Sequence, residues 1–303
     1  MPDAAPPRPL RPVQAAALAQ ITHRLGRAAE APWLHAEVAR RMAERLTLIR
    51  LQPRTLLDWC SFNGASQDLL SRAYPRSQVR RVEADAQLLR RGQAASRWWP
   101  LRRHIPCVAP SEVAAGGAEL LWANMTLQLD ADPLAAMQQW QRALAVDGFL
   151  MFSTLGPGSL QGLRQVYARC GWPAPHAPFV DMHDLGDMLL RAGFADPVMD
   201  QEILTLTWPD AEGLLRELRS LGGNADLARH PGLRTPRWRQ RLCTELQQLQ
   251  GSDGRLRLDF ELVYGHALRA APKPRMAAQT SVALDEMRAM VRSGRRAPDP
   301  HEG

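Results

Sequence analysis

The sequence is poor in the residues that build metal centres and disulfide frameworks. Its 303 residues contain no CxxC pair and no Cys/His spacing typical of a metal site. The only cysteines are four scattered ones, Cys60, Cys107, Cys170 and Cys243. We therefore expect no metal, reduced thiols and a cytoplasmic setting. No apolar run is long enough to cross a bilayer, and the first residues lack the apolar core of a secretory signal.

Lysine is almost absent. Lys273 is the only one, although Lys and Arg together number 38 against 31 Asp and Glu, for a net charge of +7. The densest basic stretch, residues 229–241, is compatible with phosphate binding and equally with the solvated start of a helix. An excess of arginine also suits an acidic protein partner. No nucleic-acid-binding motif accompanies the charge, so we expect no nucleic-acid partner.

What the sequence does contain is an alternation of short apolar strands and helical segments. A helix is expected from Gln14 to about Leu51, because apolar residues recur there at helical spacing. Strands are expected at 55–59, 78–83, 118–123, 148–153, 196–207 and 255–269. Helices are expected between them at 67–74, 87–95, 133–144, 159–170, 183–192, 209–221 and 238–250. This order predicts an α/β fold with a doubly wound, mostly parallel sheet and an inserted helical cap.

The same pattern suggests one folded domain with loose ends. Residues 1–14 are rich in proline and are expected to be disordered. Residues 15–270 are expected to form the domain, with cap segments at about 155–195 and 209–250. Residues 271–303 are expected to form a flexible tail with a short helix-prone piece near 282–292.

A doubly wound sheet binds ligands at the carboxyl ends of its strands, which directs attention to four residues. Asp58 and Gly64 flank the turn after the first strand, Glu83 ends the second, and Asn124 follows the third long strand. A glycine turn lets backbone N–H groups approach an anionic ligand, and an acid at a strand end accepts hydrogen bonds from ribose hydroxyls. Each residue also has a purely structural interpretation: an acid at a strand end is often incidental, and an asparagine often caps a helix.

These residues fall in segments that resemble a known family. Residues 56–66 resemble motif I of S-adenosylmethionine (SAM) methyltransferases, and Val82-Glu83 resembles its acidic second motif. Residues 123–128 are similar to the N-x-x-x-Q stretch of malonyl-acyl-carrier-protein O-methyltransferases. Four later segments also resemble this family: 147–160, 181–189, 215–225 and 260–267. The resemblance extends from about Arg24 to Leu268.

The resemblance implies a seven-stranded class I methyltransferase fold and SAM as the cofactor. The implied reaction belongs to biotin biosynthesis: methyl transfer to the free carboxylate of a malonyl thioester on acidic acyl carrier protein. A carboxylate is already nucleophilic, so the transfer needs positioning and exclusion of water but no catalytic base. The implied cofactor contacts are Asp58, Cys60, Asn63, Gly64, Glu83 and Asn124.

The resemblance also implies two substrate contacts. Arg219 is the candidate for binding the carboxylate, because a guanidinium binds carboxylates through two parallel hydrogen bonds. The alternative for Arg219 is a surface ion pair on a helix. His183 is a candidate for the acyl pocket, with local hydrogen bonds at a helix start as its alternative.

The sequence departs from the family in motif I. Cys60 and Phe62 replace two glycines there, and only Gly64 remains. Side chains at these positions reduce the space for the cofactor, whereas Asn63 tolerates a left-handed backbone. Two alternatives therefore stay open beside the methyltransferase hypothesis. The chain could be a catalytically degenerate binding protein with the same fold, or it could methylate another small acid.

Overall fold

The structure, a computed structural model, describes residues 11–97, 105–271, 285 and 288. The described residues up to Ala270 form one compact unit. Most of the predicted tail, including nearly all of the helix-prone piece at 282–292, lies outside the described residues. No helix in the described part of the chain is long and apolar enough to span a membrane.

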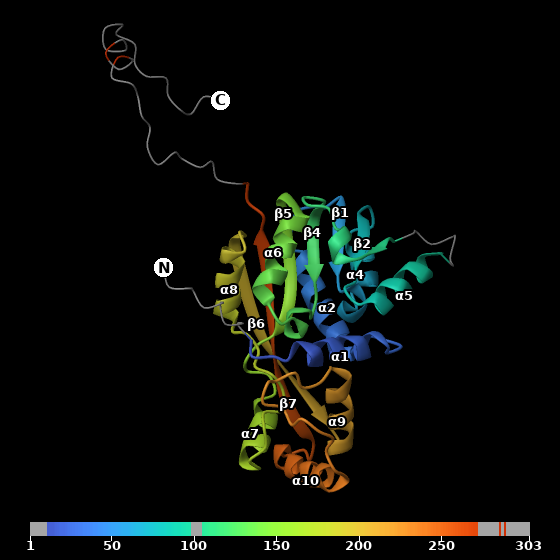
Figure 1. Ribbon diagram of the computed structural model, residues 1–303, viewed down its shortest axis with the longest axis vertical. Helices are drawn as coiled ribbons and strands as arrows, with labels where there is room; N and C mark the ends of the chain where they lie inside the picture. Colours follow the sequence, from blue (N-terminus) through green and yellow to red (C-terminus); the bar gives the residue numbers. More distant parts are fainter. Residues whose placement is uncertain (1–10, 98–104, 272–284, 286–287, 289–303) are drawn as a thin grey trace. The chain divides into compact units, whose positions relative to one another are not determined.

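A single sheet of seven strands organises this unit, in the order β3-β2-β1-β4-β5-β7-β6 (Figure 1). Strands β1 to β5 are parallel, and β7 runs antiparallel to both β5 and β6. The bounds are β1 Thr55–Trp59, β2 Gln78–Val82, β3 Cys107–Val108, β4 Ala118–Ala123, β5 Leu144–Leu155, β6 Ala195–Trp208 and β7 Leu256–Leu268. The predicted doubly wound, mostly parallel sheet is confirmed.

Helices cover both faces of the sheet because neighbouring strand residues point to opposite sides. Leu56 and Trp122 pack with α2, whereas Leu57 and Leu121 pack with α6 and α8. The helices are α1 Ala15–Gly26, α2 Trp33–Leu46, α3 Ser61–Gly64, α4 Gln67–Ala73, α5 Ala86–Arg97, α6 Pro133–Ala143, α7 Gln161–Arg169, α8 Met182–Arg191, α9 Ala211–Ser220 and α10 Pro236–Leu246. Short 3-10 turns occur at Pro110–Glu112, Leu127–Leu129 and Gln247–Leu249.

The first helical segment differs from its prediction. One helix was expected from Gln14 to about Leu51, and the structure contains two, α1 and α2, with an irregular stretch between them. Pro32 occupies the N-cap of α2 with an extended ψ of 136°. A proline lacks the N–H that would continue the helix, so the chain breaks there and turns to a second axis.

The cap consists of α7, α9 and α10. Figure 1 shows β6 and β7 extending beyond the parallel strands, with these three helices packed around their far ends. Tyr167, Trp172 and Trp238 form an aromatic cluster at the centre of the cap, with ring centroids 5.1–6.2 Å apart. The cap is thus built on the two antiparallel strands. The predicted cap segment 155–195 also included α8, which instead packs against α6 and β6 on one face of the main sheet.

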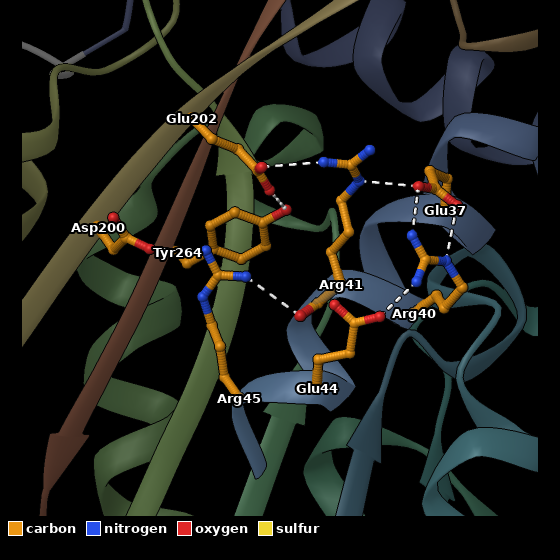
Figure 2. Close-up of polar contacts among 8 residues, drawn as sticks. All are labelled: Glu37, Arg40, Arg41, Glu44, Arg45, Asp200, Glu202 and Tyr264. Atoms are coloured by element: carbon orange, nitrogen blue, oxygen red, sulfur yellow. Dashed lines mark hydrogen bonds and ion pairs between the residues drawn. The ribbon is translucent and has the colours of Figure 1, made fainter. Parts of the chain in front are cut away.

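Ion pairs fasten α2 to the same two strands (Figure 2). Glu202 on β6 accepts a hydrogen bond from the Tyr264 hydroxyl at 2.6 Å and one from Arg41 at 2.9 Å. Arg45 bonds Asp200 at 2.6 Å, and its guanidinium lies 3.8 Å from the centre of the Tyr264 ring. Because α2 also contacts the turn after β1, this network couples the cap-bearing strands to the predicted cofactor loop.

The N-terminal segment was predicted to be disordered up to residue 14, and residues 11–14 contradict this. The Arg11 side chain is 2% exposed and donates hydrogen bonds to four backbone carbonyls. These belong to Pro178 (3.2 Å), Leu127 (3.1 Å), Gln128 (3.0 Å) and Asp130 (2.7 Å). Val13 also pairs with Asp226, next to the cap. A long-range contact of this kind leaves no periodic signal in the sequence.

We expect Arg11→Met to lower the free energy of unfolding by about 2–4 kcal/mol, because it removes four hydrogen bonds that a buried guanidinium donates to partly buried backbone carbonyls. Urea denaturation followed by circular dichroism measures this change. Arg27→Met is the control, since Arg27 is exposed and should shift stability by less than about 0.5 kcal/mol. Equal effects of the two substitutions would contradict a bracing role for Arg11.

Candidate cofactor and substrate site

The turn after β1 keeps its shape without the family's glycines. Cys60 has φ 53° and Ala65 has φ 52°, so two non-glycine residues adopt the left-handed conformation. This costs about 1–2 kcal/mol per residue. Hydrogen bonds offset the cost: the Cys60 N–H donates to Val82 at 2.8 Å, and the Gly64 N–H donates to Cys60 at 2.8 Å. The carboxyl ends of β1 and β2 therefore stay joined through the turn.

Asp58 shapes this turn from within. Its carboxylate is fully buried and accepts hydrogen bonds from the hydroxyls of Ser61 (2.6 Å) and Ser66 (3.0 Å). Burial raises the pKa of Asp58 to about 6, while the two hydroxyl bonds oppose the shift. Asp58 thus lies on the buried side of the turn. A direct contact between Asp58 and a cofactor stays a prediction.

Asn63, Gly64 and Asn124 meet in a buried hydrogen-bond network. The Asn124 amide group donates to the carbonyls of Gly64 (2.7 Å) and His35 (2.8 Å), and its oxygen accepts from Ser153 at 2.6 Å. His35, from α2, bonds the Asn63 carbonyl at 2.8 Å. Asn124 is fully buried, so its hydrogen bonds hold the turn from the side that faces the protein interior. Its role as a cofactor contact stays a prediction.

Glu83 is the residue that best fits a ribose. It lies at the carboxyl end of β2 and lines a hollow of about 410 Å³ together with Ser61, Phe62 and Arg91. One carboxylate oxygen accepts the Phe62 N–H at 2.7 Å. Burial raises the pKa of Glu83 to about 7, so the carboxylate lacks the stabilising partners that solvent or ligand hydroxyls would give it.

Phe62 narrows the same hollow. Its ring lies 4.5 Å from the guanidinium of Arg91 and lines the space beside Glu83, which a glycine at position 62 would leave open. The buried acid and the retained turn fit the adenosyl part of SAM. Phe62 lines this hollow, and a restriction of the cofactor by its ring stays a prediction.

A larger cavity of about 550 Å³ lies between the cap and the main sheet, and Arg219 lines it. Its walls include Gln128 and Leu155, which follow β4 and end β5, so the cavity reaches the carboxyl edge of the sheet. Arginine supplies all the charged side chains of this lining: Arg11, Arg24, Arg219, Arg234 and Arg239. An arginine-lined cavity with apolar walls suits an anionic ligand that carries apolar groups.

His183 is not brought to this cavity. It lies at the start of α8 with its side chain 86% exposed, and its ring bonds Asp181, the N-cap residue, at 3.0 Å. The structure therefore separates the predicted residues into three groups. Arg219 lines the cavity, Glu83 lines the smaller hollow with the turn beside it, and His183 lies on the surface.

Sequence reasoning missed three arginines of the cavity lining, Arg11, Arg24 and Arg234, and it missed His35, which bonds the turn. His35, Arg11 and Arg24 come from the N-terminal third, and Arg234 precedes α10. The only sequence signal for Arg234 was the basic stretch 229–241, which could not be told apart from a solvated helix start. The N-terminal residues reach the site through tertiary contacts that leave no local pattern.

The fold and the spaces at its carboxyl edge define a class I methyltransferase. Among solved structures, the YcgJ protein of Bacillus subtilis is similar at 10% identity, with a TM-score of 0.54 over 78% of this chain and 99% of that one. A candidate methyltransferase of Bacillus halodurans gives a TM-score of 0.53 at 12% identity, over 76% of this chain and 99% of that one. At these identities the likeness shows the fold alone.

Relatives with higher identity show the family. The malonyl-[acyl-carrier protein] O-methyltransferase of Gallionella capsiferriformans is 39% identical over 79% of this chain and 85% of its own. Those of Laribacter hongkongensis and Methylovorus are 38% and 37% identical, each over 80% of this chain and 84% of theirs. No family model matches. The chain belongs to the malonyl-[acyl-carrier protein] O-methyltransferase family, as the sequence motifs predicted.

The raised pKa of Glu83 predicts a pH-dependent stability. An acid whose pKa is higher in the folded state, about 7, than in the unfolded state, about 4.5, destabilises the fold as pH rises through that window. We therefore expect Glu83→Gln to be more stable than the wild type at pH 8, by up to about 3 kcal/mol, and to lose this advantage near pH 4.5. Urea unfolding at several pH values tests this. A difference that does not change with pH would refute the assignment.

Proposed function

We propose that the protein is a SAM-dependent O-methyltransferase that acts on the free carboxylate of a malonyl thioester carried by acyl carrier protein, as a step of biotin biosynthesis. The observation that supports it most is the cavity under the cap, where arginine is the only charged residue and Arg219 lies in the lining. A malonyl group has the matching chemistry: one carboxylate on a short, otherwise uncharged chain. The predicted cytoplasmic setting and acidic carrier partner belong to the same proposal.

In this mechanism the residues of the chain bind and orient the reactants. Bound SAM supplies an electrophilic methyl group. Arg219 holds the malonyl carboxylate through two parallel hydrogen bonds and so fixes the direction of one oxygen. Apolar walls, including Leu155 and Leu218, exclude water from that oxygen. A carboxylate is ionised and nucleophilic at neutral pH, so no side chain has to remove a proton.

Glu83 and the turn after β1 form the cofactor half of the proposal. The Glu83 carboxylate would accept the ribose hydroxyls, and the Cys60–Gly64 backbone would adjoin the rest of the nucleoside. A second candidate function, binding without catalysis, is favoured by one observation: Phe62 lines the same hollow as Glu83, where its ring takes up space that a cofactor would need.

Cofactor binding separates these two functions. We expect micromolar binding of S-adenosylhomocysteine by calorimetry, and a loss of at least about tenfold in Glu83→Ala, which removes the acceptor of the ribose hydroxyls. Asp68→Ala is the control, because Asp68 lines the same hollow but is exposed. No binding by the wild type, together with binding restored in Cys60→Gly/Phe62→Gly, would favour the binding protein.

Methylation of malonyl-acyl carrier protein tests Arg219. We expect Arg219→Gln to lower kcat/KM by about 10- to 100-fold, which corresponds to the loss of a charge-assisted hydrogen-bonded pair. Arg219→Lys should retain part of the activity, because it keeps the charge and loses the planar fork. Arg216→Gln is the matched control: Arg216 is exposed on the same helix, α9, and is not part of the cavity lining. Equal losses in Arg219→Gln and Arg216→Gln would contradict the proposed role.

A further inference from the structure

The arginines of the large cavity differ in their hydrogen-bond and ion-pair partners. The guanidinium of Arg11 donates hydrogen bonds to four backbone carbonyls. Arg24 donates to the carbonyl of Gly222, and Arg239 pairs with Glu212 at 2.8 Å. Three of the five arginines are therefore engaged by protein acceptors.

Arg219 and Arg234 have no ion pair with any residue that the structure describes. Arg234 precedes α10, and its guanidinium lies 4.5 Å from the centre of the Trp238 ring. Stacking uses the flat face of a guanidinium and leaves the N–H groups at its edge able to donate. Trp238 in turn belongs to the aromatic cluster of the cap, which restricts the position of Arg234.

Arg219, which is exposed, and Arg234, which is half-buried, line one cavity. Two guanidinium groups without an ion-pair partner among the described residues suit a ligand with two anionic groups. A malonyl thioester has a single carboxylate, which the proposed function assigns to Arg219. The second anion must therefore lie in the part of the substrate beyond the thioester.

We propose that Arg234 binds the phosphate group of the phosphopantetheine arm that links the malonyl thioester to its carrier. This inference rests on the proposed function for the nature of the substrate. The cavity that both arginines line suits such an arm, because many of its other lining residues are apolar: Leu155, Leu163, Leu215, Leu218, Leu242 and Phe260. Arg234 thus acts as a specificity-determining residue that selects phosphorylated thioesters over simpler ones.

The test compares two small substrates on the whole protein with SAM: malonyl-phosphopantetheine and malonyl-pantetheine, which differ only by the phosphate. We expect Arg234→Gln to lower kcat/KM for the phosphorylated substrate by about 10- to 100-fold and to leave the other within about twofold. Arg219→Gln should lower kcat/KM for both substrates by the same factor, because both carry the carboxylate. Arg237→Gln is the control: Arg237 is exposed on α10 and is not part of the lining.

The possible outcomes separate this inference from the proposed function. An equal loss of kcat/KM for the two substrates in Arg234→Gln would overturn the inference. A loss of kcat/KM seen only with the complete carrier protein would also overturn it. Arg234→Lys keeps the charge and should therefore keep part of the preference for the phosphorylated substrate. If Arg234→Lys loses this preference as completely as Arg234→Gln does, with the free energy of unfolding unchanged, the inference is also overturned. If the wild type methylates neither these substrates nor malonyl-acyl carrier protein, the proposed function fails. Calorimetry with phosphopantetheine and pantetheine alone then decides whether Arg234 binds phosphate.

Discussion

The buried amide of Asn124 is the contact on which the site depends. It joins α2, the turn after β1 and β5 through hydrogen bonds to His35, Gly64 and Ser153, all of 2.8 Å or less. Both donors and the acceptor of the amide are used, and an unpaired buried polar group costs about 1–3 kcal/mol, so the arrangement is strongly specified. This network holds Gly64, at the end of the turn, while the hydrogen bonds of the Cys60 backbone to Val82 and Gly64 hold its left-handed start.

Ionisable groups lie in both parts of the site. Asp58 and Glu83 are buried acids whose pKa values rise to about 6 and about 7, chiefly through desolvation. Glu83 lines the smaller hollow together with Arg81 and Arg91, whereas Asp58 lies beneath the turn. Arg219 and Arg234 line the cavity under the cap, where no described residue of the lining carries a carboxylate. This difference between the two spaces suits a site for two chemically different ligands.

The sequence predicted those features that depend on local pattern. Short apolar strands alternating with helices gave the sheet, and Glu83 was identified from its place at a strand end. Asn124 was also identified from the sequence. Its position after β4 did not show that its amide group makes all its hydrogen bonds to other residues of the protein. Arg11 and Arg234 depend on contacts with distant segments, and neither periodicity nor motif spacing carries that information. His183 belongs to a family-like segment, yet its own helix cap holds it at the surface.

The two spaces of the site differ in how they depend on the turn after β1. Phe62 lines the hollow beside Glu83, and the cavity that contains Arg219 has none of the turn residues in its lining. Arg219 and Arg234 have no ion pair with a described residue, and an anionic ligand in this cavity would neutralise them. The cavity under the cap is therefore suited to a substrate. Activity then depends on whether the hollow beside Glu83 admits the cofactor past the ring of Phe62.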